Sequence, residues 1–350
     1  MAGPAICVYG AGSVGCLLGG LLSPAADVVL VGRAHLAAEV AAHGLHLTSW
    51  RGADLRLPPG HLRYVTDGSI AAKADLVLVT VKSDATEEAG RELASVLKPT
   101  ALVISFQNGL GNAGVLRDHL PRHVVLAGMV PFNVLHRGEG AFHRASAGEL
   151  MVEAHAALMP FASLFAAAGL PLLRRGDMPQ VQWAKLLFNL NNAINALSDL
   201  PLKDELGQRD YRRCLALLQR EALRALDMAH IRPAKLTPLP PHWIPRLLEA
   251  PDAVFRVLAS RLMAIDPLAR SSTWEDLRAG RRTEIAHMNG EVVRLAPRLG
   301  VSAPANARVI DMIRAAEAGD RRRWSGAELL SELRTAAEAH LAHGEKLIPR

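Results

Sequence analysis

The N-terminal half of the chain alternates short apolar runs with amphipathic stretches. The apolar runs do not alternate with polar residues, which is typical of strands covered on both faces in a parallel sheet with helices on either side. Glycine, histidine and charged residues become more frequent over residues 131–153, where we expect extra edge strands to close this half. Buried strands are predicted at Ala5–Tyr9, Asp27–Val31, Asp75–Val81, Ala101–Ser105 and His123–Ala127.

After Gly176 the strand patterns stop and apolar residues recur with the period of a helix. Thr237–His242 contains three prolines and predicts an extended loop between helices. The fold class is therefore α/β followed by all-α. At 350 residues the chain exceeds what one core usually serves, and we predict two domains, residues 1–176 and 177–350. Helices are predicted at Gln180–Leu197, Gln208–His230, Trp243–Leu262, Arg281–Leu299 and Ala305–Ala316.

Composition narrows the function classes. Half the residues are hydrophobic, as in an ordinary globular protein, and the net charge of +6 favours an anionic ligand. Aromatic residues make up only 4% of the chain, which argues against a nucleic-acid partner that stacks its bases. The apolar stretch at residues 5–32 is interrupted by glycines, Pro24 and Asp27, so we predict no membrane partner.

Cysteine and histidine usage adds little chemistry. The three cysteines have no CxxC spacing, which predicts reduced thiols and a cytoplasmic protein. Arg321–Arg323 and the pair His340 and His343 are interpreted as a solvated basic turn and a tail. No metal site is predicted.

A glycine motif follows the first predicted strand. Gly10, Gly12 and Gly15 have the spacing GxGxxG between a strand and a helix, where backbone N–H groups, including those of Ser13 and Val14, can face a pyrophosphate. The alternative is that these glycines serve only tight packing. Because the motif lies within a strand–helix–strand unit of about 30 residues, we favour dinucleotide binding.

Three polar residues follow predicted strands, at the edge of the sheet where a nucleotide would bind. An NAD enzyme places an acid after the second strand, whereas this chain has Arg33, which predicts NADP(H) with a guanidinium on the 2′-phosphate. Lys82 and Asn108 follow two further strands and are expected to converge on the cofactor. Taken singly, each is also compatible with an ordinary exposed or turn residue.

The helical half carries a lysine and asparagines in an apolar helix. At about 100° per residue, Lys185, Asn189 and Asn192 share one face of a continuous helix, whereas Asn195 points away. A buried amine beside amides costs free energy unless it is used, so a site is favoured over a capped core lysine. Downstream, Ser272 and Glu284 lie in segments that composition alone describes as helix starts.

These motifs together resemble the ketopantoate reductase (2-dehydropantoate 2-reductase) family over nearly the whole chain. The resemblance implies a Rossmann domain followed by a helical domain like that of 6-phosphogluconate dehydrogenase. It further implies Lys185 as the catalytic lysine with Glu284 as the acid, and substrate contacts by Asn189, Ser272 and Asn108. Its cofactor-contacting positions fall on Arg33, Lys82 and Asn108. The motifs that carry it are Gly10–Gly15, Val81-Lys82, Gln107-Asn108-Gly109, Lys185–Asn189, and Ser271-Ser272 with Gly280–Glu284.

Two departures from the family pattern concern the substrate. The second family asparagine lies eight residues after the lysine, where this chain has Ala193. Either Asn192, which has the better helical phase, or Asn195, which looks like the family element displaced by two residues, would replace it. A local π-bulge would change that phase. The acid motif also ends in Ala286 where the family has aspartate.

The resemblance implies reduction of 2-dehydropantoate to (R)-pantoate in pantothenate biosynthesis, with hydride from NADPH passing to the C2 carbonyl and a lysine as general acid. Alternatives are an NADPH-dependent reductase of another 2-oxo acid, and a catalytically silent NADP(H)-binding sensor. Retention of Lys185, Ser272 and Glu284 argues against the sensor, which needs only the first half. The expected partner is a small 2-oxo acid, and a homodimer is left open.

Overall fold

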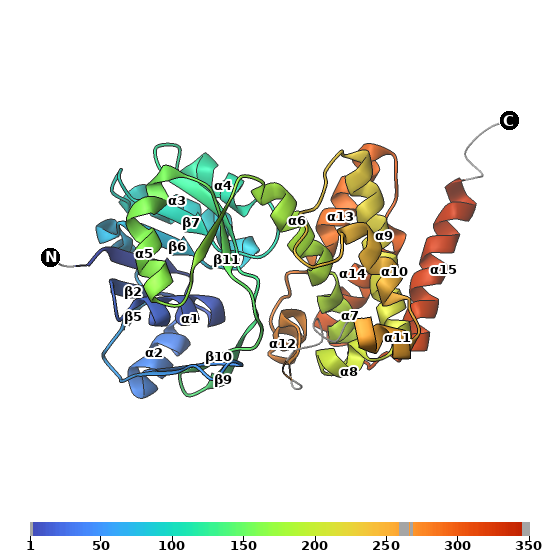
Figure 1. The fold of residues 1–350 in the computed structure, drawn as a ribbon, viewed down its shortest axis with the longest axis horizontal. Helices are drawn as coiled ribbons and strands as arrows, with labels where there is room; N and C mark the ends of the chain where they lie inside the picture. Colours follow the sequence, from blue (N-terminus) through green and yellow to red (C-terminus); the bar gives the residue numbers. More distant parts are fainter. Residues whose placement is uncertain (1–2, 259–265, 267–268, 345–350) are drawn as a thin grey trace. The chain divides into compact units, whose positions relative to one another are not determined.

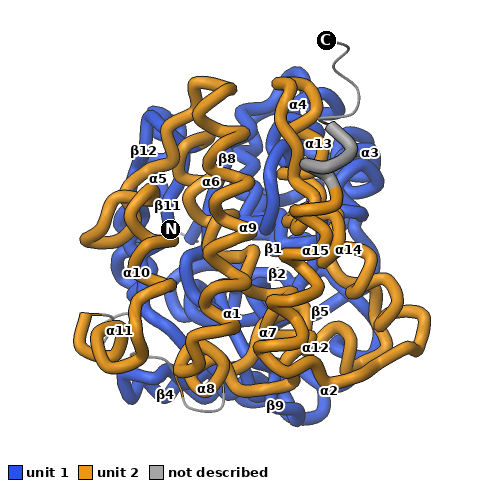
Figure 2. Tube along the Cα trace, turned by 90° about the vertical axis from the view of Figure 1, so that its right-hand side faces the viewer, with its two compact units in different colours: residues 1–178 blue, residues 179–350 orange. Residues whose placement is uncertain are grey.

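The computed structural model describes residues 3–258, 266 and 269–344, without the side chains of residues 340–344. It divides into two compact units, residues 1–178 and 179–350, coloured separately in Figure 2. Each unit is described by itself. The side chains of His340 and His343 lie outside the described part.

Unit 1 is built on an eight-stranded sheet with the order β12-β11-β8-β7-β6-β1-β2-β5. All neighbouring strands are parallel except β8 and β11. The predicted strands are all present, and the predicted α/β fold class is confirmed. The bounds are β1 Ala5–Tyr9, β2 Asp27–Val31, β5 Arg63–Val65, β6 Leu76–Val79, β7 Leu102–Ser105, β8 Val124–Met129, β11 Leu150–Glu153 and β12 Leu172–Arg175.

A second, four-stranded sheet was not predicted as a separate layer. Its strand order is β4-β3-β10-β9. The side chains of Leu45, Leu47 and Phe142 belong to the same core cluster as residues of helix α1 (Ser13–Leu22). Of the strands expected over residues 131–153, only β11 joins the main sheet, and it lies between two strands rather than at an edge. The bounds are β3 Leu45–Ser49, β4 Asp54–Leu57, β9 Val134–Gly138 and β10 Ala141–Arg144.

Helices cover both faces of the main sheet (Figure 1). Along β1, Ile6 and Val8 join one core cluster, and Cys7 and Tyr9 join another, because successive side chains point to opposite faces. The first cluster contains residues of α1 Ser13–Leu22, α2 Ala34–His43 and α5 Met159–Ala167. The second contains residues of η1 Gly68–Lys73, α3 Thr86–Val96 and α4 Asn112–His119.

Unit 2 is helical throughout its described residues, as predicted. The long helix α9 packs against α7, α8, α10, α13, α14 and α15. The helices are α6 Met178–Asn189, α7 Asn191–Ser198, α8 Leu202–Leu206, α9 Arg209–Met228, α10 Ile244–Leu248, α11 Asp252–Leu258, α12 Ser272–Arg278, α13 Asn289–Leu295, α14 Pro304–Glu317 and α15 Gly326–Gly344.

Helix α9 also holds a buried arginine that fixes the neighbouring helix. The Arg212 side chain is fully buried, and its guanidinium donates to the carbonyls of Leu206, Leu248 and Ala250 and pairs with Asp252 at 2.7 Å. The donors of this guanidinium are therefore used within the fold, and Arg212 is structural.

Three predicted helices differ from the structure. The helix expected at residues 180–197 is interrupted at Leu190, next to asparagines of low helix propensity, although the Leu190 N–H still donates to Leu186. The helix expected at Arg281–Leu299 is divided into the 3-10 helix η5 Ile285–His287, α13 and the 3-10 helix η6 Ala296–Leu299. Residues 281–284 are not helical, and the N–H and hydroxyl of Thr283 both donate to Glu317. The one expected at residues 243–262 is divided into α10 and α11, and residues 259–262 lie outside the described part.

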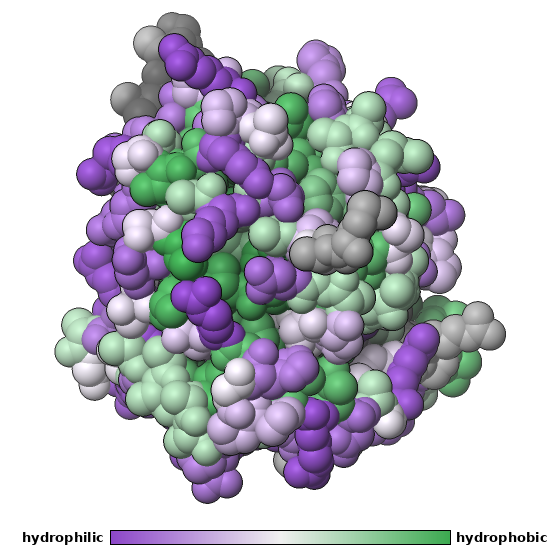
Figure 3. All heavy atoms as spheres, turned by 90° about the vertical axis from the view of Figure 1, so that its left-hand side faces the viewer, coloured by the Kyte–Doolittle hydropathy of each residue, from purple (hydrophilic) through white to green (hydrophobic). Residues whose placement is uncertain are grey.

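The described residues contain neither a candidate membrane span nor a cluster of metal ligands. No helix among them is long and apolar enough to cross a bilayer, and no cluster of three or more potential metal ligands occurs among them. Arg321–Arg323 is an exposed turn, as interpreted from the sequence. On the face drawn in Figure 3, hydrophobic side chains lie in several groups separated by polar and charged ones.

Candidate functional site

The three motif glycines have three different surroundings. A Cβ on Gly10, which has φ +89°, would lie 2.3 Å from Val81 Cγ1, and a Cβ on Gly15 would lie 2.7 Å from Thr80 Oγ1. A Cβ on Gly12 would meet no protein atom within 4 Å. Gly10 and Gly15 are thus required by close packing, whereas Gly12 keeps space clear in front of the turn.

The space at Gly12 fits a dinucleotide. Gly12 is the N-cap of α1, so the first-turn N–H groups of Ser13 and Val14 point toward the same open side. Both residues are partly exposed. A tight first glycine, an open second one and a packed third one are the arrangement that a pyrophosphate needs.

Arg33 is placed directly after β2 and Gly32. It is exposed and forms the N-cap of α2. A Cβ on Gly32 would lie 2.3 Å from the Tyr64 hydroxyl, which in turn donates to the carbonyl of Ala11. Tyr64 therefore holds the end of β2 against the glycine turn, and the Arg33 side chain starts beside that turn.

The loops that carry Lys82 and Asn108 are joined by buried side chains. Ser83 Oγ donates to the Asn108 carbonyl at 2.9 Å, and Asn112 Nδ2 donates to the same carbonyl at 2.7 Å. Lys82 itself is exposed, and Asn108 is partly exposed. The structure therefore brings the ends of β6 and β7 together, with both candidate cofactor residues on them.

A second layer of the same network lies behind these loops. Gln107 Nε2 donates to Thr86 Oγ1 at 2.7 Å, and Gln107 Oε1 accepts from Ser105 Oγ at 2.8 Å. Thr86 Oγ1 lies 2.8 Å from the Ser83 carbonyl and 3.0 Å from Asn112 Oδ1. These buried groups satisfy one another, so the two strand ends are held in fixed positions.

Lys185 lies on α6 in unit 2, one turn before Asn189. Its side chain is partly buried, and desolvation lowers the pKa of its ammonium to about 8. Asn189 is 8% exposed. Because residues four apart are neighbours on a helix surface, the ammonium and the amide lie on one face. A lysine with this pKa can hold or release a proton near neutral pH.

Asn192 lies at the start of α7, after the interruption at Leu190. It is partly exposed, and its Nδ2 lies 3.6 Å from Met288 Sδ, so it reaches the segment that follows Glu284. Its backbone carbonyl accepts from Ser271 Oγ at 2.9 Å. Asn192 thus connects α7 with the segment around Ser272 and with the segment that follows Glu284.

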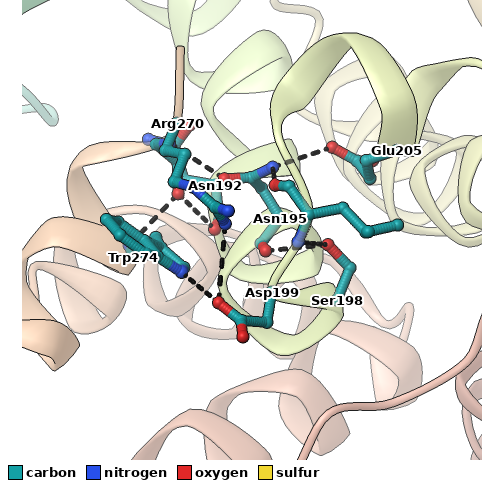
Figure 4. Close-up of polar contacts among 9 residues, drawn as sticks. Asn192, Asn195, Ser198, Asp199, Glu205, Arg270 and Trp274 are labelled. Carbon is teal, nitrogen blue, oxygen red and sulfur yellow. Dashed lines mark hydrogen bonds and ion pairs between the residues drawn. The ribbon is translucent and has the colours of Figure 1, made fainter. Parts of the chain in front are cut away.

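Asn195 has a different environment. It is 0% exposed, and its Nδ2 donates to the Leu200 carbonyl at 2.9 Å and contacts Glu205 Oε2 at 3.3 Å. Its Oδ1 accepts from the Ser271 N–H at 2.9 Å. Figure 4 shows Asn195 between Glu205 and the start of α12. All polar atoms of this amide are therefore occupied within the protein.

Glu205 is the buried carboxyl at the end of this chain of contacts. It is 0% exposed, and burial raises its pKa to about 8, against the hydrogen bonds that Asn191 and Asn195 donate to Oε2. Its Oε1 and Asn191 Oδ1 are both buried without a hydrogen-bond partner among the described residues. A proton on Oε1 would reduce this deficit, which agrees with the raised pKa.

Ser271, rather than Ser272, is the cap of α12. Ser271 Oγ accepts from the Trp274 N–H at 3.2 Å, whereas Ser272 occupies the first helical position with an exposed side chain. Trp274 Nε1 donates to Asp199 Oδ1 at 2.6 Å, and the Arg270 guanidinium lies 4.2 Å from the Trp274 ring centroid (Figure 4). These contacts attach the start of α12 to the end of α7.

Glu284 lies immediately before η5 (Ile285–His287) and is 8% exposed. The preceding Thr283 is fixed to Glu317 on α14 by two hydrogen bonds, and the His287 N–H donates to the Glu284 carbonyl at 2.9 Å. The backbone around Glu284 is thereby held in place, and Met288 carries this segment to Asn192.

Within each unit the structure brings some of the predicted residues together, and Lys185 and Asn189 share helix α6. Gly10–Gly15, Arg33, Lys82 and Asn108 follow neighbouring strands of unit 1, and Asn192 connects the segments of Ser272 and Glu284 in unit 2. Sequence reasoning named Ser271 only as part of a motif and did not identify the role of the supporting residues. Ser83 and Thr86 had a weak signal, as hydroxyls at a helix start, but nothing local marked Glu205. These supporting residues are Ser83, Thr86, Asn112, Asn191, Glu205 and Ser271.

Comparisons with known proteins identify the family. The family "Ketopantoate reductase PanE/ApbA" matches residues 6–157, and "Ketopantoate reductase PanE/ApbA C terminal" matches residues 177–317. A 2-dehydropantoate 2-reductase of Halobacterium salinarum is 29% identical over 330 residues, which cover 89% of this chain and 98% of the relative.

Solved structures give the same result. A PanE/ApbA family ketopantoate reductase from Ralstonia eutropha is 30% identical with a TM-score of 0.76, covering 91% of this chain and 100% of that one. A D-mandelate dehydrogenase, solved with NADH and anilino(oxo)acetate, shares the fold at 19% identity and a TM-score of 0.73, covering 90% and 98%. With both halves matched in order, this chain belongs to the ketopantoate reductase family and is an oxidoreductase.

Proposed function

We propose that this chain reduces the C2 carbonyl of 2-dehydropantoate to give (R)-pantoate, with NADPH as the hydride donor. Lys185 carries the proposal: its pKa of about 8 leaves it largely protonated at neutral pH, and it shares a helix face with Asn189. Membership of the ketopantoate reductase family, and relatives named 2-dehydropantoate 2-reductase, support the same reaction.

Unit 1 is the proposed NADP-binding domain. The N–H groups of Ser13 and Val14 would hold the pyrophosphate in the space that Gly12 leaves. Arg33 would bind the 2′-phosphate, and Lys82 and Asn108 would contact the cofactor from the neighbouring strand ends. When bound, this cofactor supplies the hydride.

Unit 2 is the proposed substrate and catalytic domain. Negative charge grows on the C2 oxygen as the hydride arrives, and the Lys185 ammonium donates a proton to that oxygen. A positioned general acid contributes about 10²–10⁴-fold to the rate. After the reaction Lys185 is neutral, and its lowered pKa makes this state accessible near neutral pH.

Four further residues have proposed roles around this step. Glu284 would hold the ammonium or a substrate hydroxyl, and Asn189, Asn192 and Ser272 would bind substrate hydroxyl and carboxylate groups. The partial exposure of Asn192 supports its choice over Asn195. Asn195, whose polar atoms are occupied, would act as a positioning residue that holds α12 against α7.

NADPH oxidation against a panel of 2-oxo acids tests this proposal. We expect turnover with 2-dehydropantoate at a kcat/KM well above that for pyruvate, 2-oxoisovalerate and benzoylformate. A preference for another member of the panel would assign a different 2-oxo acid. Tight NADPH binding with no turnover on any of them would make the chain a sensor.

A homodimer is part of the proposal. One structure with the same fold, at 16% identity and a TM-score of 0.63, is described as a dimeric ketopantoate reductase from Staphylococcus aureus. Sedimentation equilibrium of the full chain measures the mass directly. A mass near twice 37.6 kDa supports the dimer, and a mass of one chain contradicts it.

A further inference from the structure

Unit 1 contains a cavity of about 300 Å³ whose lining includes none of the proposed cofactor residues. Its walls come from the turn after β3, the end of β10, the loop that leads into β11 and the turn before β12. Its volume is at the lower end of the range for small-molecule sites. The side chains that matter for its chemistry are Trp50, Arg51, Phe132, Arg144 and Glu149.

Two arginines line this cavity side by side. The Trp50 N–H donates to the Arg144 carbonyl at 3.0 Å, which brings the turn that carries Arg51 close to the end of β10, where Arg144 lies. The Arg144 guanidinium lies 4.0 Å from the Phe132 ring centroid, and the Arg51 guanidinium lies 4.8 Å from that of Trp50. Each guanidinium is therefore oriented by an aromatic ring on the cavity wall.

Arg144 is also anchored from behind. It is partly buried, and its Nη2 donates to the Gly148 carbonyl while its Nε lies 3.4 Å from the Ser146 carbonyl. The loop that accepts these bonds is itself constrained, since Gly148 has φ +128° and a Cβ there would lie 2.5 Å from Pro131 Cγ. The cavity wall is thus preformed around the guanidinium.

No carboxylate of the described residues neutralises the positive charges of the two arginines. Burial and the charge of Arg51 both lower the pKa of Arg144, so the two groups repel each other. Glu149, the acid in the lining, is exposed, and no ion pair joins it or any other described carboxylate to either guanidinium. An anion between the two guanidinium groups would relieve this repulsion.

We propose that this cavity is a binding site for a small organic anion, whose phosphate or carboxylate group pairs with Arg51 and Arg144 while its flat apolar part lies against Trp50. Planar guanidinium groups bind both kinds of oxyanion with two parallel hydrogen bonds. The half-exposed indole, 38% accessible, offers an apolar face to the remainder of the ligand.

Calorimetric titration of the full chain, saturated with NADP⁺, tests the site with phenyl phosphate, benzoate and uncharged benzyl alcohol. We expect one of the two anions, or both, to bind with one-to-one stoichiometry, and benzyl alcohol to bind at least tenfold more weakly. Binding of phenyl phosphate alone assigns a phosphate ester, and binding of benzoate alone assigns a carboxylate. Binding of neither anion at 10 mM overturns the proposal.

Variants then locate the binding. Arg51→Gln removes an exposed charge and should weaken the anion at least tenfold, the loss typical of a charge-assisted hydrogen bond. Arg144→Lys keeps the charge but not the planar fork, and should also weaken it. Arg56→Gln, an exposed arginine on β4 outside the lining, is the matched control and should change nothing.

Tryptophan fluorescence tests whether the ligand lies against the indole of Trp50. Trp50→Phe should abolish any change in tryptophan fluorescence on titration while calorimetry still records binding. Equal affinity in wild type and Arg51→Gln, or an equal loss in Arg56→Gln, would each overturn the proposal. The proposed function is tested by a different measurement, NADPH oxidation with 2-oxo acids, so the failure of one proposal can be distinguished from the failure of the other.

Discussion

The two units position their candidate residues in different ways. In unit 1, Gly12, Arg33, Lys82 and Asn108 follow directly after strands, so the backbone of the sheet sets their places. In unit 2, Lys185 and Asn192 lie on helices, and the segments of Ser272 and Glu284 reach Asn192 through Ser271 and Met288. A nucleotide site made by strand ends is thus local in sequence, whereas a substrate site among helices depends on long-range contacts.

Substitutions in the two units should therefore change different properties of the protein. A change at a strand end in unit 1 should affect cofactor binding with little effect on folding, because these side chains are exposed. A change in the buried amide network of unit 2 should affect stability and catalysis together, because Asn195 and Glu205 hold the helices that carry the site.

The largest effect is expected from Lys185→Ala. Loss of the general acid should lower kcat by a factor of 10² or more, within the range for positioned acids, while NADPH affinity stays within about twofold because the cofactor residues lie in unit 1. Stopped-flow and equilibrium fluorescence measure the two quantities. Lys203→Ala, which removes an exposed lysine of unit 2, is the control and should have wild-type kcat. A Lys185→Ala enzyme with wild-type kcat would require another acid.

Glu205→Gln should change the pH dependence of stability. The carboxyl has a pKa of about 8 in the folded protein, above the ordinary 4.5, so the folded state binds its proton more tightly than the unfolded state. Stability from this group is therefore complete below about pH 4.5 and is lost as pH rises toward 8, by up to about 4 kcal/mol. The neutral glutamine avoids this loss and should unfold at higher denaturant than wild type at pH 8.

A second buried glutamate provides the contrast. Both carboxylate oxygens of Glu221 accept hydrogen bonds from the start of α14, at Ala305 and Asn306. Glu221→Gln would turn an amide donor toward these donors, and should destabilise the protein at every pH by roughly 1–3 kcal/mol. If Glu205→Gln behaved in the same way, its carboxyl would be ionised in the folded state.

Arg33→Ala tests the unit 1 side of the comparison. Loss of a charge-assisted phosphate contact should cost roughly 1.5–3 kcal/mol of NADPH binding, and NADH binding should remain almost unchanged. Dissociation constants for both cofactors, with Arg56→Ala as the control, measure this. Equal affinity of the wild-type protein for the two cofactors would exclude a role for Arg33 in choosing between them.

The smallest effects separate the two asparagines. Asn192→Ala should lower kcat/KM for 2-dehydropantoate by about 1–3 kcal/mol of transition-state binding, with unchanged stability. Asn195→Ala removes the hydrogen bonds that Asn195 makes to the Ser271 N–H and the Leu200 carbonyl, and one of the two that Glu205 Oε2 accepts, and should lower the unfolding free energy by a similar amount. A full loss of activity in Asn195→Ala with wild-type stability would reverse the assignment.

The sequence predicted the sheet and the location of the nucleotide motif because both depend on local patterns. Gly10–Gly15 follows β1 directly, and apolar runs identify the strands. It did not predict the second sheet, in which β3 pairs with β10 across about 95 residues, nor the interruption at Leu190. Glu205 was also missed, because only the folded chain shows which amides surround a carboxyl in a short helix.

The pH dependence of catalysis tests the central claim, that Lys185 delivers the proton. Its pKa of about 8 predicts that kcat/KM for 2-dehydropantoate at saturating NADPH is level at lower pH and falls tenfold per unit above about pH 8, as the ammonium loses its proton. A value of kcat/KM that stays constant from pH 7 to pH 10 would contradict the account.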